Sequence, residues 1–378
     1  MTGPVRIYLA PGMFGFARLA AYDYFEHVER ALRRRFRAIG QSVEIRVVEV
    51  HPTSSIRRRS AKLTQLIAHT AGTDDGPIHI IGHSTGGLDA RLVASPSVHL
   101  NAVADQQLKW LSRLHTITTI NTPHYGTPLA TFFATAKGQQ LLYAVCAITV
   151  AGLKLGAPPL AAASALVAAV GRTNAASGVD LALIDNVTSG VSRALDEAAN
   201  RDLRDWLALV RDDQGGVVQL MPEAMDLFGA GVEDRPAVLY RCCASYAPPA
   251  GPRHYARSIR TPWAAVSAVL FRLMQRVTST QDPRYPCAPA DVDVAARLRG
   301  RLPQVPPDGA NDGVVPLSSM LWGAPIWVGQ GDHLDMVGHF PGPDGHNDWM
   351  RSGASFDLDR WDELMDRIFE GISAPHRA

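Results

Sequence analysis

Apolar segments of strand length alternate along the chain with segments in which apolar residues recur at helical spacing. The strand-like segments are residues 5–9, 43–50, 78–81, 115–120, 238–244 and 326–328. Helices are predicted over 22–36, 60–69, 85–94 and 358–372, the first because of the spacing of Phe25, Val28, Leu32 and Phe36. This alternation predicts an α/β fold with a mostly parallel central sheet flanked by helices.

The stretch from residue 126 to residue 179 has a different character. It contains no Asp or Glu and is rich in Ala, Leu and Val. Its apolar runs, 141–153 and 155–171, are shorter than the roughly 20 residues that a membrane span needs. We therefore expect helices packed over the carboxyl edge of the sheet rather than a membrane hairpin. The predicted organisation is one domain, 1–378, with a helical lid or cap insertion over 127–230.

Composition excludes some classes of protein. With 46% hydrophobic and 19% charged residues, the chain can bury a core and is not wholly disordered. A formal charge of +1 gives no electrostatic argument for a nucleic-acid partner. Two arginine clusters, in 30–37 and 57–59, are interpreted as a solvated helix face and a loop. Attraction to an anionic interface is the alternative.

The four cysteines, Cys146, Cys242, Cys243 and Cys287, have neither zinc-site spacing nor the density of a disulfide scaffold. The adjacent pair should point to opposite faces of a strand, which leaves a bridge from one of them to Cys287 open. Residues 1–4 lead directly into the first strand without a secretory signal. We expect a cytoplasmic protein, or an exported one whose leader is absent from the sequence.

Residues 82–86 read Gly-His-Ser-Thr-Gly and match the pattern G-x-S-x-G. In this motif the serine lies on a tight strand-to-helix turn, which exposes its hydroxyl and directs the next backbone N–H toward a developing oxyanion. Here the motif follows the buried segment 78–81 and precedes a helical pattern, which is the context it requires. We predict that Ser84 is a nucleophile. The alternative is a surface turn.

A serine nucleophile needs a general base, and the base needs an orienting carboxylate. In this arrangement the acid and then the histidine follow the serine along the chain. Asp312 lies in a tight turn, and His333 lies in the loop after strand 326–328, so we predict them as acid and base. The other nearby histidines receive lesser roles: His79 in the core, His83 and His124 beside the site, His339 beyond it and His346 at the surface.

A second oxyanion donor is expected in the loop after the first strand, residues 10–16, here called the oxyanion loop. Gly12 and Gly15 allow the backbone to approach a ligand closely, which makes the N–H of Met13 the candidate donor beside that of Thr85. The alternative is an ordinary glycine-rich turn.

Several segments, in this order, resemble bacterial true lipases (lipase family I). The matching segments are 9–16 with 23–25 for the oxyanion loop, 82–87 for the nucleophile turn, 121–127 for the turn into the lid, and 311–316 and 332–335 for acid and base. The resemblance implies an α/β-hydrolase fold with a mobile lid. It also implies hydrolysis of long-chain carboxylic esters, most directly as a triacylglycerol lipase.

The same resemblance assigns Ser84, Asp312 and His333 as a catalytic triad and the N–H groups of Met13 and Thr85 as oxyanion donors. It implies no cofactor for the chemistry itself. The expected partner is a lipid or another hydrophobic ester, bound at an interface; no stable membrane span and no protein partner are expected.

Two positions complicate the resemblance. Pro11 stands where the family usually has histidine. Many members bind a structural calcium ion through a carboxylate two residues after the catalytic histidine, and Asp335 has this position. The next family ligand falls at His339, a poor ligand for calcium. The candidates for a further acid are Asp282, Asp291 and Asp293. A turn or helix-cap role is the alternative for Asp335.

Two other functions remain open at this stage. An intracellular polyester (polyhydroxyalkanoate) depolymerase or a phospholipase would use the same triad on another substrate. A hydrolase-fold binding protein without catalysis is the third hypothesis, which the intact Ser, Asp and His segments disfavour.

Overall fold

Six parallel strands form one sheet in the order β2-β1-β3-β4-β5-β6 within the described residues. The computed structural model describes residues 3–13, 24–51, 53–100, 104–135, 138, 139, 142, 197–248, 262–289, 293–343, 346, 348 and 350–374. The strands are β1 (Val5–Ala10), β2 (Val43–Val47), β3 (Ile78–His83), β4 (Leu114–Ile120), β5 (Leu239–Tyr246) and β6 (Ala324–Gln330). The prediction of a mostly parallel sheet is confirmed.

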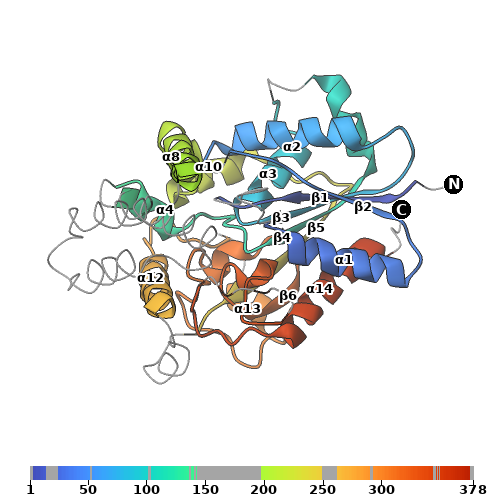
Figure 1. Ribbon diagram of the computed structural model, residues 1–378. Helices are drawn as coiled ribbons and strands as arrows, with labels where there is room; N and C mark the ends of the chain where they lie inside the picture. Colours follow the sequence, from blue (N-terminus) through green and yellow to red (C-terminus); the bar gives the residue numbers. More distant parts are fainter. Residues whose placement is uncertain are drawn as a thin grey trace.

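Helices cover both faces of this sheet (Figure 1). On one face lie α1 (Glu26–Ala38) and α14 (Leu358–Ser373), and on the other lie α2 (Ile56–Thr70) and α3 (Thr85–Ala94). A strand between two helical layers must present apolar side chains in both directions, which explains the nearly continuous apolar runs in the sequence.

The interior strand β1 illustrates this two-sided burial. Val5, Ile7 and Leu9 belong to the core that α1 and α14 cover, whereas Tyr8 and Ala10 belong to the core under α2 and α3. All five side chains are buried. The period of two along the strand therefore divides its residues between two cores.

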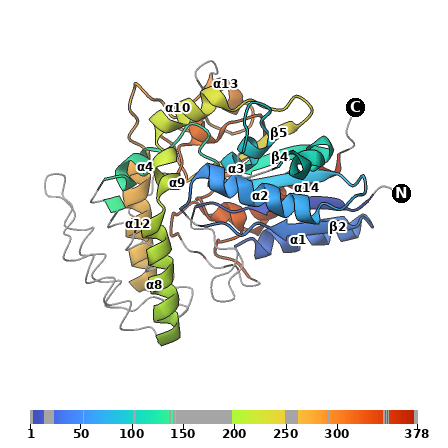
Figure 2. The ribbon, with the colours of Figure 1, turned by 90° about the horizontal axis from the view of Figure 1, so that it is seen from above.

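Further helices gather beyond the carboxyl ends of the strands, as Figures 1 and 2 show for α4, α8 and α12. Their bounds are α4 (Pro128–Phe133), α8 (Glu197–Asp212), α9 (Gly215–Gln219), α10 (Pro222–Gly231) and α12 (Pro262–Thr278). The predicted lid, 127–230, includes α4, α8, α9 and α10, but almost all of 136–196 lies outside the described residues. The lid therefore stays a prediction. No helix in the described part of the chain has the length and apolarity to cross a membrane.

Short helical segments complete the described structure: η1 (Asp105–Arg113), α13 (Val294–Leu298), η2 (Leu317–Met320) and η3 (Asp335–Val337).

The cysteines behave as the strand period predicts. Cys242 packs in a core with Leu298 and Val315, while Cys243 packs on the other face of the sheet with the α1 and α14 core. Cys242, Cys243 and Cys287 are all buried free thiols, so the bridge to Cys287 that the sequence left open does not form. Cys146 lies outside the described residues.

Four of the five arginines of α1 pair with acids. Arg30 and Arg33 contact Glu26 and Glu29 one turn earlier in the helix, and Arg35 contacts Asp362 and Asp366 of α14. This surface is therefore a mixed-charge helix face, as the simpler interpretation of the sequence expected.

Candidate active site

Ser84 lies in a strained turn between β3 and α3. Its φ of 53° and ψ of −127° place it in a region that L residues rarely adopt. The turn fits only because glycines surround it: a Cβ atom on Gly86 would lie 2.0 Å from the carbonyl oxygen of Ala10, and one on Gly82 would lie 2.4 Å from the Gly86 carbonyl carbon. The local geometry is that of the predicted nucleophile turn.

The start of the oxyanion loop lies directly against Ser84. A Cβ atom on Gly12 would approach the Ser84 Cβ to 2.7 Å, so only glycine leaves room there. The Met13 N–H donates to Thr85 Oγ1 at 2.9 Å. The Thr85 N–H is the first of α3 and so has no acceptor within the helix. Residues 14–23 of the loop region lie outside the described residues.

Asp312 and His333 are in direct contact, although both come from loops. His333 Nδ1 lies 2.5 Å from Asp312 Oδ2, and the His333 N–H donates to the Asp312 carbonyl oxygen at 3.0 Å. The other carboxylate oxygen, Asp312 Oδ1, accepts from the N–H groups of Val314 and Val315 at 2.8 and 2.7 Å. The tight turn that the sequence predicted thus fixes the carboxylate before it meets the imidazole.

His83, the last residue of β3 and the neighbour of Ser84, contacts His333. The ring of His83 lies 4.7 Å from that of His333, and His83 Nε2 donates to the His333 carbonyl oxygen at 2.9 Å. The strand that ends at the serine therefore also contacts the loop that carries the histidine. The acid and the base are thus in contact, and the loop of the base contacts the residue that precedes Ser84.

Asn121 is a residue of this site whose role the sequence did not indicate. It follows β4 in a left-handed conformation, with φ of 47°, and is fully buried. Its Nδ2 donates to Asp312 Oδ2 at 2.8 Å and to Ser245 Oγ at 2.7 Å, while its Oδ1 accepts from the Ser245 N–H at 3.0 Å. Asn121 therefore connects the ends of β4 and β5 to the acid.

Arg59 corrects the interpretation of the second arginine cluster. Its side chain is only 1% exposed and pairs with the equally buried Asp89 of α3 at 2.9 Å. The guanidinium also donates to the Pro11 carbonyl oxygen at 2.5 Å. Arg59 is therefore not a solvated residue, and the buried pair holds the oxyanion loop through the backbone of the unusual proline.

The candidate calcium ligands among the described residues contact other protein groups. Asp335 Oδ2 accepts from the Asp332 N–H at 2.8 Å, while the ring of His339 is bonded to the Tyr24 backbone. Of the other candidate acids, Asp282 and Asp293 pair with neighbouring arginines, and Asp291 lies outside the described residues. No group of three or more His, Cys, Asp or Glu side chains among the described residues is arranged to hold a metal ion. Asp335 stabilises the turn at Asp332 through this bond, and the calcium ion stays a prediction.

Asp332, Asp335 and Asp348 form a buried acidic cluster. Burial raises the pKa of Asp332 to about 7 and that of Asp348 to about 8, and burial together with Asp332 raises the pKa of Asp335 well above its usual value. One carboxylate oxygen each on Asp332 and Asp348 is buried without a hydrogen-bond partner. Burial thus favours the protonated form of these carboxyl groups, while Asp348 Oδ2 also pairs with Arg351 at 3.1 Å.

The remaining histidines have structural contacts. His79 is buried in the sheet and bonds Thr116 Oγ1 at 2.8 Å, as expected of a core residue. His124 is buried between Arg91 and Thr119, so it shapes the turn after β4. His346 is partly exposed, and its ring stacks on that of His27 with centroids 3.8 Å apart.

The fold is similar to those of solved lipases and esterases. EstA from Clostridium botulinum aligns over 100% of this chain and 89% of its own, with a TM-score of 0.54 and 18% identity. The Staphylococcus hyicus lipase aligns over 98% and 97%, with a TM-score of 0.52 and 15% identity. A metagenomic carboxyl esterase aligns over 98% and 76%, with a TM-score of 0.50 and 13% identity. The chain has the α/β-hydrolase fold.

Sequence similarity is more local. The triacylglycerol lipase of Vibrio cholerae serotype O1 is 37% identical over 90 residues, which are 24% of this chain and 27% of that protein. The α/β-hydrolase chain thus matches about a quarter of the length of this relative. No protein-family model matches the sequence.

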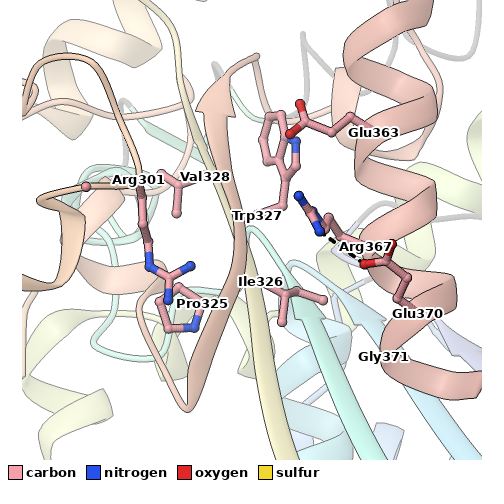
Figure 3. A pocket seen from close by; sticks show the side chains of 10 residues that line it. Arg301, Pro325, Ile326, Trp327, Val328, Glu363, Arg367, Glu370 and Gly371 are labelled. Atoms are coloured by element: carbon pink, nitrogen blue, oxygen red, sulfur yellow. Dashed lines mark hydrogen bonds and ion pairs between the residues drawn. The ribbon is translucent and has the colours of Figure 1, made fainter. Parts of the chain in front are cut away.

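A hollow on this α/β-hydrolase fold lies away from the candidate site. Its volume is about 520 Å³, and it lies between β6 and α14. Figure 3 shows β6 running between Arg301 on one side and Arg367, which pairs with Glu370, on the other. The residues that line this hollow do not include Ser84, Asp312 or His333. The hollow is therefore not the place of the predicted chemistry.

Proposed function

We propose that this chain is a serine ester hydrolase that acts on hydrophobic carboxylic esters, as a triacylglycerol lipase or long-chain esterase. The contact of 2.5 Å between His333 Nδ1 and Asp312 Oδ2, beside the strained turn of Ser84, carries this proposal. The likeness to named lipases and esterases supports the class of substrate.

The chemistry follows from the tautomer that Asp312 selects. The Nδ1–H of His333 donates a hydrogen bond to the Asp312 carboxylate, which leaves Nε2 without a hydrogen and able to take the proton of the Ser84 hydroxyl. Ser84 Oγ attacks the ester carbonyl, and His333 returns the proton to the departing alcohol. Water, deprotonated by the same histidine, then releases the carboxylic acid from the acyl-enzyme.

The N–H groups of Met13 and Thr85 would stabilise the negative oxygen of each tetrahedral intermediate. Because Met13 donates to Thr85 Oγ1 in this structure, the substrate oxygen has to replace that hydroxyl as acceptor. Loss of one such donor costs about 3–4 kcal/mol of transition-state stabilisation.

An ester chain-length profile tests the proposal. Initial rates are measured on p-nitrophenyl esters from acetate to palmitate and on emulsified triolein, for wild type, Ser84→Ala and the control Ser95→Ala at the other end of α3. We expect activity on long esters and triolein, a loss of at least about 10³-fold in Ser84→Ala, and wild-type rates in the control.

Two outcomes contradict parts of the proposal. If triolein in emulsion is hydrolysed no faster than dissolved short esters, the hypothesis of a lipase gated by the predicted lid is wrong. The protein would then be an esterase for short esters. If Ser84→Ala keeps its activity, Ser84 is not the nucleophile.

A further inference from the structure

His83 is held in one tautomer by its two partners. It ends β3, next to Ser84, and its side chain is fully buried. Its Nε2 faces the His333 carbonyl oxygen at 2.9 Å, and because a carbonyl only accepts, this nitrogen carries the hydrogen. Its Nδ1 is then an acceptor, and the Tyr24 hydroxyl lies 2.5 Å away to donate. Burial lowers the pKa of His83 well below its usual value, so the ring stays neutral.

Tyr24 links this histidine to the oxyanion loop. Its side chain is buried, and burial raises the pKa of its hydroxyl, which therefore remains protonated. The same hydroxyl is hydrogen-bonded to the backbone of Gly12, whose N–H is the available donor. The ring itself packs edge-on against Phe25, with centroids 5.0 Å apart, which fixes the direction of the hydroxyl.

Together these bonds form an uninterrupted series from the Gly12 N–H through the Tyr24 hydroxyl and the His83 ring to the His333 carbonyl. At one end, Gly12 precedes Met13, the proposed oxyanion donor. At the other end, His333 is the proposed base, and its N–H is already bonded to Asp312. Both main-chain groups of the base are thus held, one by the acid and one by His83.

We propose that Tyr24 and His83 are positioning residues that fix the base relative to the oxyanion loop. This inference rests on the proposed function, because it concerns the geometry of the same reaction. Among the described hydrogen bonds, neither side chain bonds Ser84 Oγ or a ring nitrogen of His333. Asp312 orients the imidazole ring, whereas the Tyr24–His83 pair sets where the His333 backbone lies.

The expected kinetic signature is a fall in kcat with little change in KM. The same base acts in formation and in hydrolysis of the acyl-enzyme, so a displaced base slows both steps together. Substrate binding does not use these bonds. A loss of global structure would instead reduce the amount of active protein and the thermal stability in parallel.

The test compares four variants on one soluble p-nitrophenyl ester, with melting temperatures measured alongside. Tyr24→Phe removes only the hydroxyl, and we expect kcat to fall about tenfold. His83→Leu removes both bonds and should lower kcat further, whereas His83→Gln retains an N–H donor for the His333 carbonyl and should recover most of the activity. The control Tyr8→Phe removes another buried hydroxyl, bonded to Thr70 on α2, and should leave kcat unchanged.

A second measurement does not depend on activity. In ¹⁵N-histidine NMR spectra of the wild-type protein, His83 should be neutral with its hydrogen on Nε2 from pH 5 to pH 9. The variant His79→Gln identifies the signals of another buried histidine, so that they are not mistaken for those of His83. A His83 that titrates in this range, or carries its hydrogen on Nδ1, overturns the proposal. So does a Tyr24→Phe variant whose kcat equals that of Tyr8→Phe. A wild-type protein without esterase activity would instead overturn the proposed function itself.

Discussion

At the scale of single residues, the left-handed backbone of Asn121 determines how the acid is held. Its conformation turns the side-chain amide toward Asp312 and Ser245, so one amide group binds two loops. A residue other than glycine in this region costs about 1 kcal/mol. Both Asn121 and Ser84 therefore have a positive φ that is unfavourable for residues other than glycine.

Substitutions at Asn121 should separate the contact from the strain. Asn121→Gly removes the amide but suits the backbone, whereas Asn121→Ala removes the amide and keeps the strain. Because the bond is to a charged group, we expect kcat to fall roughly 10- to 100-fold in both variants. Urea unfolding should show Asn121→Ala to be less stable than Asn121→Gly by about 1 kcal/mol. Wild-type kcat in the glycine variant would contradict the role of the amide.

The sequence predicted Ser84, Asp312 and His333 because each lies in a segment with a recognisable pattern after a strand. It did not predict the roles of Asn121 or Tyr24. Their roles depend on hydrogen bonds across 191 and 59 residues of sequence, respectively, to Asp312 and to His83. The position of Asn121 directly after a strand was the one available signal, because side chains there reach the carboxyl edge of the sheet.

At the scale of elements, strands and amphipathic helices were predictable wherever burial imposes a period. Helix α12 was not predicted, although Pro262 begins it and Ala264, Ala268 and Phe271 recur at helical spacing on its buried side. It follows 249–261, which lie outside the described residues; Thr261 before Pro262 was an available start signal, because Thr is a preferred N-cap and Pro a preferred first helical residue. The start of α2 was also placed too late, because Ser55 caps it by accepting the Arg58 N–H.

The packing of α2 on α3 should depend on the buried Arg59–Asp89 pair. Arg59→Met leaves the Asp89 carboxylate uncompensated, so we expect a loss of about 3–5 kcal/mol in the free energy of unfolding. Adding Asp89→Leu should restore much of this stability, but not the activity, because the Pro11 carbonyl loses its donor. Urea titrations with parallel rate measurements test both points. If Arg59→Met alone is as stable as the wild type, the role of the pair is contradicted.

At the scale of the whole molecule, the acidic cluster should make global stability pH-dependent. Burial raises the pKa of Asp332 to about 7 and that of Asp348 to about 8, from 3.8. The folded state therefore binds more protons than the unfolded state at pH values between the unfolded pKa of 3.8 and these folded pKa values. The cluster's contribution is full at low pH and is lost as the pH rises through the folded values.

Asp348→Asn should accordingly raise the urea midpoint more at pH 8 than at pH 5. The measurement is made in EDTA, so that no metal ion contributes.

The wild-type urea midpoint is then measured again with added calcium. Because Asp335 and His339 contact protein groups, calcium should leave this midpoint unchanged. A calcium-dependent rise would favour the calcium interpretation of the sequence instead.

The central claim is that a serine, an acid and a histidine from distant segments form one reactive site in an α/β-hydrolase fold. A fluorophosphonate probe reacts covalently with a serine only when a base activates it, so labelling followed by peptide mass spectrometry tests the claim most directly. We predict a single labelled residue, Ser84, with labelling slowed strongly in His333→Ala. A folded wild-type protein that is not labelled, or is labelled at another serine, would contradict this account.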